Sequence, residues 1–129
     1  MQIIGLGTDL VETARIKSAL ERFGEHFYKR ICSAGELNIA ADKNFAASFF
    51  AGRWAAKEAA AKALGCGIGE NCSFNDIEIL NDPNGRPVMT LYGNARIMAE
   101  NLHVCDIKIS ISHENNYAVA TVILSGREK

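Results

Sequence analysis

The cysteines of this sequence are too few, and its hydrophobic runs too short, for several classes of protein. Four cysteines stand among 129 residues, and they lack the C-x-x-C pairs that zinc sites favour. A domain of this size needs no disulfide, so we interpret them as ordinary reduced thiols. No apolar run approaches the ~20 residues that cross a bilayer. Because the chain goes from Met1-Gln2 straight into Ile3-Ile4 without a basic leader, we expect a cytoplasmic protein.

A strong excess of charge of either sign is also missing. The formal net charge of −1 argues against general nucleic-acid binding, which usually needs a strongly basic domain. The distribution is less even than the total, because five basic residues stand against two acidic ones between Arg15 and Arg30. From composition alone, a solvated helix face with ion pairs is the favoured interpretation of this stretch.

Length and residue pattern predict one α+β domain over residues 1–129. A second hydrophobic core would hardly fit, and no repeat or linker divides the chain. The segment 117–124 is apolar on both faces, which is typical of a central strand. We expect strands at 2–11, 73–80, 86–92, 106–112 and 117–124, and helices at 13–31 (which Gly24 can interrupt), 34–41, 44–64 (capped by Asn44 and stopped by Gly65) and 93–103.

The first candidate for chemistry is Asp9, at the end of the first predicted strand. It follows a Gly-x-Gly, and glycines allow another backbone or a ligand to come close. The alternative is an acid that helps to cap the following helix. The residues alone leave both interpretations open.

The second candidate lies inside the long predicted helix. Glu58 and Lys62 are separated by four residues and share a helix face. They could form only an exposed ion pair, worth ~0.3–0.5 kcal/mol. Surrounding alanines instead suggest close packing, and a carboxylate in that setting needs a partner such as a metal ion. Arg53 lies around the helix from Glu58, where it could reach another part of an extended ligand, and we interpret Lys57 as structural.

A third candidate, Ser112-His113, ends a predicted strand, where it could hold a phosphate or simply begin a turn. No second histidine or suitably spaced serine indicates a hydrolytic triad, and the glycine-rich loop at 65–69 lacks the P-loop pattern. Two acids on separate elements with several bases are what magnesium-assisted phosphoryl chemistry requires. These residues predict a possible magnesium–phosphate site.

Four motifs of this chain, taken together, resemble the holo-acyl carrier protein synthases. Residues 5–12 (GLGTDLVE) resemble the first motif of that family, and residues 50–65 (FAGRWAAKEAAAKALG) resemble its W/F-x-x-K-E-x-x-x-K motif. The turn at 84–87 (NGRP) and the strand end at 109–113 (ISISH) are also similar. The match runs nearly end to end, in order and at the expected spacing.

The resemblance implies a fold and a reaction. The fold would be a mainly antiparallel sheet packed on a long helix, as in 4′-phosphopantetheinyl transferases. The reaction would move 4′-phosphopantetheine from coenzyme A to a serine of apo-acyl carrier protein, for fatty acid biosynthesis, and release 3′,5′-ADP. Asp9 and Glu58 would bind Mg²⁺, and Lys62 would contact the pyrophosphate of coenzyme A. Glu58, directly or through water, would accept the serine proton.

The same resemblance implies how the ligands and partners are held. Arg53 and His113 would bind the 3′-phosphate of coenzyme A, and the segment Asn84, Gly85, Arg86 and Pro87 would line the adenine pocket. Arg15 and Arg22 would dock an acidic carrier protein, and the enzyme would be a homotrimer with active sites between subunits. Two alternatives stay open: a non-catalytic module that binds coenzyme A, and a magnesium-dependent phosphohydrolase acting on nucleotides.

Overall fold

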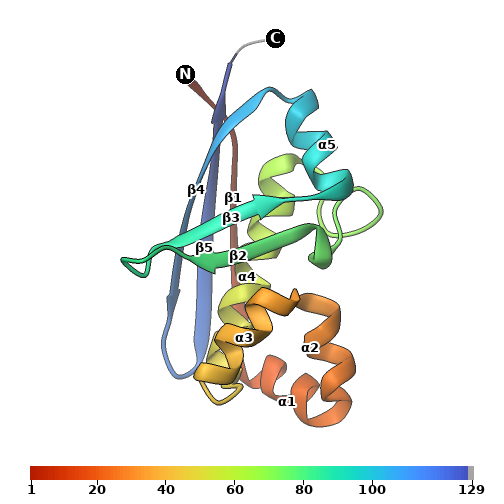
Figure 1. The fold of residues 1–129 in the computed structure, drawn as a ribbon, viewed down its shortest axis with the longest axis vertical. Helices are drawn as coiled ribbons and strands as arrows, with labels where there is room; N and C mark the ends of the chain where they lie inside the picture. Colours follow the sequence, from red (N-terminus) through yellow and green to blue (C-terminus); the bar gives the residue numbers. More distant parts are fainter. Residues whose placement is uncertain (128–129) are drawn as a thin grey trace.

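In the computed structural model, which describes residues 1–127, one long helix, α4, forms the centre of the fold. Figure 1 shows the three-stranded sheet on one side of α4, the helices α1 to α3 gathered at one end, and α5 at the other. The chain runs in the order β1 (Gln2–Glu12), α1 (Thr13–Phe23), α2 (Glu25–Ile31), α3 (Ala34–Asp42), α4 (Ala47–Leu64), the 3₁₀ helix η1 (Phe74–Asp76), β2 (Ile77–Asn81), β3 (Pro87–Leu91), α5 (Gly93–Asn101), β4 (Val104–His113) and β5 (Tyr117–Gly126).

The strands form two antiparallel sheets. The larger has the order β1-β5-β4, so the predicted central position of residues 117–124 is confirmed. The smaller is the hairpin of β2 and β3, which crosses in front of α4 in Figure 1. An α+β fold with antiparallel strands on a long helix is therefore confirmed, although the strands are divided between two sheets.

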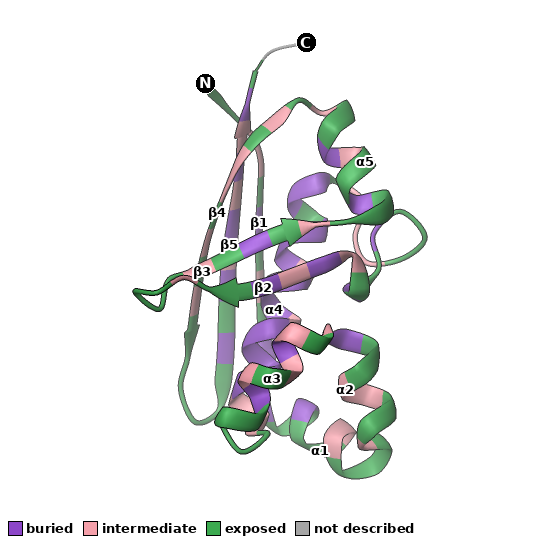
Figure 2. Ribbon diagram, in the orientation of Figure 1, coloured by how far each residue is buried: buried purple, intermediate pink, exposed green. Residues whose placement is uncertain are grey.

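The composition of α4 explains its central place. Most of its residues are buried, and the helix is buried along most of its length in Figure 2. Alanine is the strongest helix former, and its small side chain lets neighbouring elements come close on every side. Gly65 ends the helix in the left-handed conformation, with φ 86°, as predicted.

The helix expected at 13–31 is divided at Gly24, which takes a φ of 51°, so the predicted interruption is confirmed. Two other predicted boundaries are wrong for local reasons. The helix expected to begin at Asn44 begins three residues later, because Asn44 and Phe45 both take left-handed φ angles, of 56° and 52°. Phe45 packs there against Tyr28 and Phe50.

The strand expected at 73–80 begins only at Ile77. Ser73 and Asp76 form a reciprocal capping box that closes η1 in front of it. The apolar residues of 2–11 suggested a buried strand, but Leu6 and Leu10 are exposed on the outer face of the sheet. Within residues 1–127, no helix has both the length and the apolar character to span a membrane.

Candidate functional site

Asp9, Glu58 and Lys62 come together where β1 lies along α4. The Lys62 ammonium donates hydrogen bonds of 3.0 Å to the Asp9 carboxylate and to the carbonyl of Thr8. Glu58 lies one turn earlier on α4 and is half-buried. Burial and then the negative charge of Asp9 raise its pKa above the usual range, while Lys62 opposes that rise. The carboxylates of Asp9 and Glu58 therefore interact electrostatically.

Two glycines of β1 make this approach possible. A Cβ at Gly5 would lie 2.1 Å from the carbonyl oxygen of Ala63, and one at Gly7 would lie 1.9 Å from that of Ala59. The backbones of β1 and α4 are therefore in direct contact. This contact places Asp9, the next residue but one after Gly7 on β1, beside α4. The Gly-x-Gly before Asp9 was expected to allow a backbone or a ligand to come close. The structure shows that the backbone of α4 is the group that comes close.

These residues fit a magnesium ion. Mg²⁺ takes one or two protein carboxylates and completes its shell with water and phosphate oxygens. Asp9 and Glu58 supply two carboxylates. Burial first, and then the charge of Asp9, raise the pKa of Glu58, and a divalent cation would offset both effects. Among residues 1–127, no group of three or more His, Cys, Asp or Glu side chains is placed to hold a metal ion.

A second cluster surrounds a pocket of about 440 Å³ at the N-terminal end of α4. Arg53 and His113, predicted as partners, both line it. From the predicted turn, Gly85 and Pro87 line it too, whereas Asn84 is exposed outside it. Arg86 lines a neighbouring groove between β3, β4 and α5. The structure therefore brings together only part of the predicted coenzyme A set.

Arg53 is nearly buried in this pocket wall, with its side chain 9% exposed. Its guanidinium lies over the ring of Phe49, 4.6 Å from the centroid, and its Nε and Nη2 atoms have no hydrogen-bond partner among the described residues. Burial lowers the pKa of Arg53, and Glu36 opposes that shift. An arginine stays charged in proteins, so this guanidinium has unused capacity to bind an anion.

Sequence reasoning missed two polar residues of the same pocket, Lys43 and Ser48. Lys43 is the C-cap residue that follows α3. Ser48 lies in the first turn of α4, whose N-cap residue Ala46 provides no side-chain hydrogen bond. The uncapped amide groups and the positive end of the helix dipole favour an anion there. The sequence did not indicate that α4 begins at Ala47. In a helix that began at Asn44, Ser48 would lie beyond the first turn and away from the helix N-terminus.

The two clusters lie on different sides of α4. Arg53 and Glu58 are five residues apart, which is about 140° around a helix. Of the described residues, those lining the Arg53 pocket do not include Asp9, Glu58 or Lys62. Each cluster is thus half of the predicted site, and a single chain does not enclose both.

The basic residues of the N-terminal helices are exposed. Arg15 and Arg22 both lie on α1, separated by seven residues, so they project from nearly the same face. Lys29 instead forms an exposed ion pair with Glu25, as expected if this stretch is a solvated helix face. Beside α1 is an apolar pocket of about 490 Å³, lined by Ala19, Phe23, His26, Phe27, Arg30, Ile31, Trp54 and Phe74.

This arrangement defines a class of protein, and comparisons with known proteins agree with it. The model of the 4′-phosphopantetheinyl transferase superfamily matches residues 5–122. The chain therefore belongs to the 4′-phosphopantetheinyl transferase superfamily.

Within that superfamily, the chain is similar to the holo-[acyl-carrier-protein] synthases. It is 47% identical to the holo-[acyl-carrier-protein] synthase of Aliivibrio fischeri, over 95% of this chain and 98% of that protein. The structure of the Helicobacter pylori holo-[acyl-carrier-protein] synthase in complex with coenzyme A is similar with a TM-score of 0.82 and 37% identity, over 93% of this chain and 99% of that one. The Neisseria meningitidis enzyme gives a TM-score of 0.88 and 33% identity, over 95% and 98% of the two chains. The resemblance read from the four motifs is confirmed.

Proposed function

We propose that this protein transfers the 4′-phosphopantetheine group of coenzyme A to a serine of an apo-acyl carrier protein and thereby supplies the holo carrier for fatty acid biosynthesis. The serine oxygen forms a bond to the β-phosphorus, the bond from that phosphorus to the bridging oxygen breaks, and 3′,5′-ADP leaves. The observation that carries the proposal is the meeting of Asp9, Glu58 and Lys62 in a chain that belongs to this superfamily.

Asp9 and Glu58 are the residues that we propose to hold Mg²⁺. When bound, the ion supplies Lewis-acid polarisation of pyrophosphate oxygens. Lys62 is half-exposed and already lies between β1 and α4, where its ammonium offsets negative charge on the pyrophosphate. Glu58 accepts the serine proton, directly or through water.

The pocket at the start of α4 is the proposed site for the 3′-phosphate of coenzyme A. Arg53 and His113 line it together, and the Nε and Nη2 atoms of Arg53, which have no hydrogen-bond partner among residues 1–127, support an anionic ligand. We add Lys43 and Ser48 to this site, since both line the same pocket. The turn Asn84, Gly85, Arg86 and Pro87 stays the proposed adenine contact, with Gly85 and Pro87 nearest to the phosphate pocket.

A homotrimer is proposed because one chain presents the two half-sites on different sides of α4. The outer face of the three-stranded sheet carries apolar residues in adjacent register, with Leu10 opposite Val119 and Leu6 opposite Ile123. Leu6 and Leu10 are each 64% exposed in a single chain. An apolar face of this kind favours association. Contact between copies would let the Arg53 pocket of one subunit meet the Asp9 and Glu58 carboxylates of the next.

The face of α1 is the proposed docking surface for an acidic carrier. Arg15 and Arg22 are exposed on it and can steer a negatively charged partner. The apolar pocket beside them reaches Trp54, which lies one helical turn before Glu58 on α4. A carrier held by α1 would therefore bring its serine toward the carboxylates.

We also propose that residues 1–129 form one domain in the cytoplasm. A single hydrophobic core that includes α4, β1, β5 and α5 supports the first proposal. The second is supported by the four cysteines, all of which are free thiols.

The experiment that tests the reaction mixes the protein with coenzyme A, magnesium chloride and an apo carrier protein. Mass spectrometry should detect a phosphopantetheine adduct on the carrier serine, together with 3′,5′-ADP. Coenzyme A binding without an adduct would identify a non-catalytic module instead. Release of nucleotide without any carrier would identify a phosphohydrolase, and either result would overturn the proposal.

A further inference from the structure

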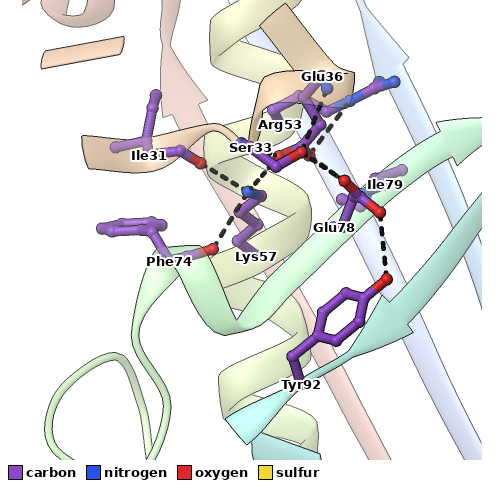
Figure 3. Close-up of polar contacts among 9 residues, drawn as sticks. All are labelled: Ile31, Ser33, Glu36, Arg53, Lys57, Phe74, Glu78, Ile79 and Tyr92. Atoms are coloured by element: carbon purple, nitrogen blue, oxygen red, sulfur yellow. Dashed lines mark hydrogen bonds and ion pairs between the residues drawn. The ribbon is translucent and has the colours of Figure 1, made fainter. Parts of the chain in front are cut away.

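A buried ionic network joins α3, α4 and β2 and includes Arg53, which lines the pocket (Figure 3). Lys57 is fully buried, and its ammonium donates to the Glu36 carboxylate at 2.7 Å and to the carbonyls of Ile31 at 2.6 Å and Phe74 at 3.1 Å. All three ammonium hydrogens are therefore used. This confirms a structural position for Lys57, and the network also includes a neighbour that the proposed reaction uses.

Glu36 is also fully buried, and its two oxygens are already well occupied. One oxygen accepts from Lys57 and from the backbone amide of Ser33 at 2.8 Å, and the other accepts from the amide of Ile79 at 3.0 Å. Arg53, one helical turn before Lys57, comes no closer than 3.9 Å through its Nε. That separation is too long for a hydrogen bond.

The Glu36 carboxylate is shared unequally between two cations. Arg53 and Lys57 both lie beside this one fully buried carboxylate, while the second acid of the network, Glu78, accepts hydrogen bonds from the hydroxyls of Ser33 and Tyr92. Lys57 makes the short contact with Glu36, while the Nε and Nη2 atoms of Arg53 have no hydrogen-bond partner among residues 1–127. Arg53 is therefore the more weakly compensated of the two cations, and it is the one that lines the pocket.

We propose that Lys57 is a positioning residue for coenzyme A binding: by holding Glu36, it keeps the Arg53 guanidinium free for the 3′-phosphate. The inference rests on the proposed function of Arg53. Without the Lys57 charge, Arg53 becomes the nearest cation to Glu36 and is drawn to it. Its charge is then offset inside the protein, and the pocket loses its preference for a phosphate.

The test compares the dissociation constants of coenzyme A and 3′-dephospho-coenzyme A, measured by titration calorimetry in magnesium chloride. The wild type should prefer coenzyme A by about tenfold or more, as expected of a charge-assisted contact. Lys57→Met should lose most of that preference. Lys57→Gln, which keeps amide donors for the carbonyls of Ile31 and Phe74, should lose it as well. Lys17→Met, the same substitution at an exposed lysine of α1, should keep it.

The double variant Glu36→Gln/Lys57→Met separates this role from a merely structural one. It removes both charges of the pair and leaves Arg53 with an uncharged neighbour, so the preference for coenzyme A should return. If Lys57 only stabilises the fold, the single and double variants will lower the melting temperature and weaken both ligands equally. That result would overturn the inference.

Arg53→Ala distinguishes a failure of this inference from a failure of the proposed function. Loss of the preference in Arg53→Ala, with the preference retained in Lys57→Met and Lys57→Gln, would reject the positioning role alone. A preference retained in Arg53→Ala would reject the phosphate assignment of Arg53, and the inference with it.

Discussion

Gly7 on β1 lies so close to Ala59 on α4 that a Cβ at Gly7 would stand 1.9 Å from the Ala59 carbonyl oxygen. No real Cβ tolerates that distance, and a backbone oxygen inside a helix cannot turn aside. This contact fixes how β1 lies along α4. It thereby also places Asp9, two residues farther along β1, beside Glu58 and Lys62. Strand packing and the carboxylate pair are thus consequences of the same glycine.

Gly7→Ala should therefore damage the fold and the metal site together. We expect the free energy of unfolding, measured by urea denaturation, to fall by at least about 2 kcal/mol, because β1 must move away from α4. Magnesium affinity should fall as well. Gly69→Ala is the matched control, since a Cβ there meets nothing within 4 Å. Near-wild-type stability in Gly7→Ala would mean that β1 and α4 are farther apart than described.

The carboxylate pair itself makes the second prediction. Asp9→Asn and Glu58→Gln should each reduce transfer to the carrier at least about 100-fold, as expected when a metal ligand is lost. Each should also weaken Mg²⁺ binding in calorimetry, while circular dichroism shows an intact fold. Glu12→Gln, an exposed acid at the end of the same strand, should change neither. Near-normal turnover of Asp9→Asn or Glu58→Gln at modest magnesium would sink the proposed metal site.

Much of the fold is predictable from local pattern. The alanines and Gly65 indicate α4 and its end, Ser33 and Glu36 indicate the start of α3 through their capping box, and the apolar strand 117–124 indicates the centre of the sheet. Each signal lies within a few residues of the feature that it determines. The start of α4 is different, because Phe45 is held by Tyr28, far away in the chain.

The candidate site follows the same division. Asp9, Glu58 and Lys62 are indicated by residue type and by resemblance, and their meeting depends on a strand and a helix that are individually predictable. The pairing of Lys57 with Glu36 joins residues 21 positions apart on different helices, so spacing along one helix gave no sign of it. Lys43 and Ser48 were missed because their relation to Arg53 depends on the true start of α4.

Two buried thiols make a prediction about alkaline pH. Burial is the main cause that raises the pKa of Cys32, and likewise of Cys72, to about 12, from an ordinary value of 9.0. Above pH 9 the unfolded chain loses these protons while the folded protein keeps them. Stability should therefore fall as pH rises from 9 toward 12, by about 1 kcal/mol for each thiol at pH 10.

Urea denaturation at pH 8 and pH 10 measures this loss. Cys32→Ala/Cys72→Ala should lose less stability between the two pH values than the wild type, whatever its stability at pH 8. Cys105→Ala, at an exposed thiol, should behave like the wild type. Equal losses in all three proteins would show that other groups cause the alkaline instability.

The exposed face of α1 makes the prediction that links this structure to its partner. Arg15 and Arg22 project from nearly the same side of one helix, and an acidic carrier docked there would gain steering and a few exposed ion pairs. Reversing both charges turns that attraction into repulsion. Arg15→Glu/Arg22→Glu should therefore raise the KM for the carrier well beyond about tenfold, with little change in the KM for coenzyme A.

Salt separates this explanation from general damage. Added salt screens exposed charges, so it should weaken carrier binding by the wild type far more than by Arg15→Glu/Arg22→Glu, which has already lost the attraction. Arg96→Glu/Lys108→Glu changes the net charge by the same amount at exposed positions on α5 and β4. This control should keep the wild-type KM for the carrier and the wild-type salt dependence of carrier binding. If Arg15→Glu/Arg22→Glu and the wild type were equally sensitive to salt, the carrier would dock elsewhere. The basic residues of α1 would then be no more than a solvated helix face.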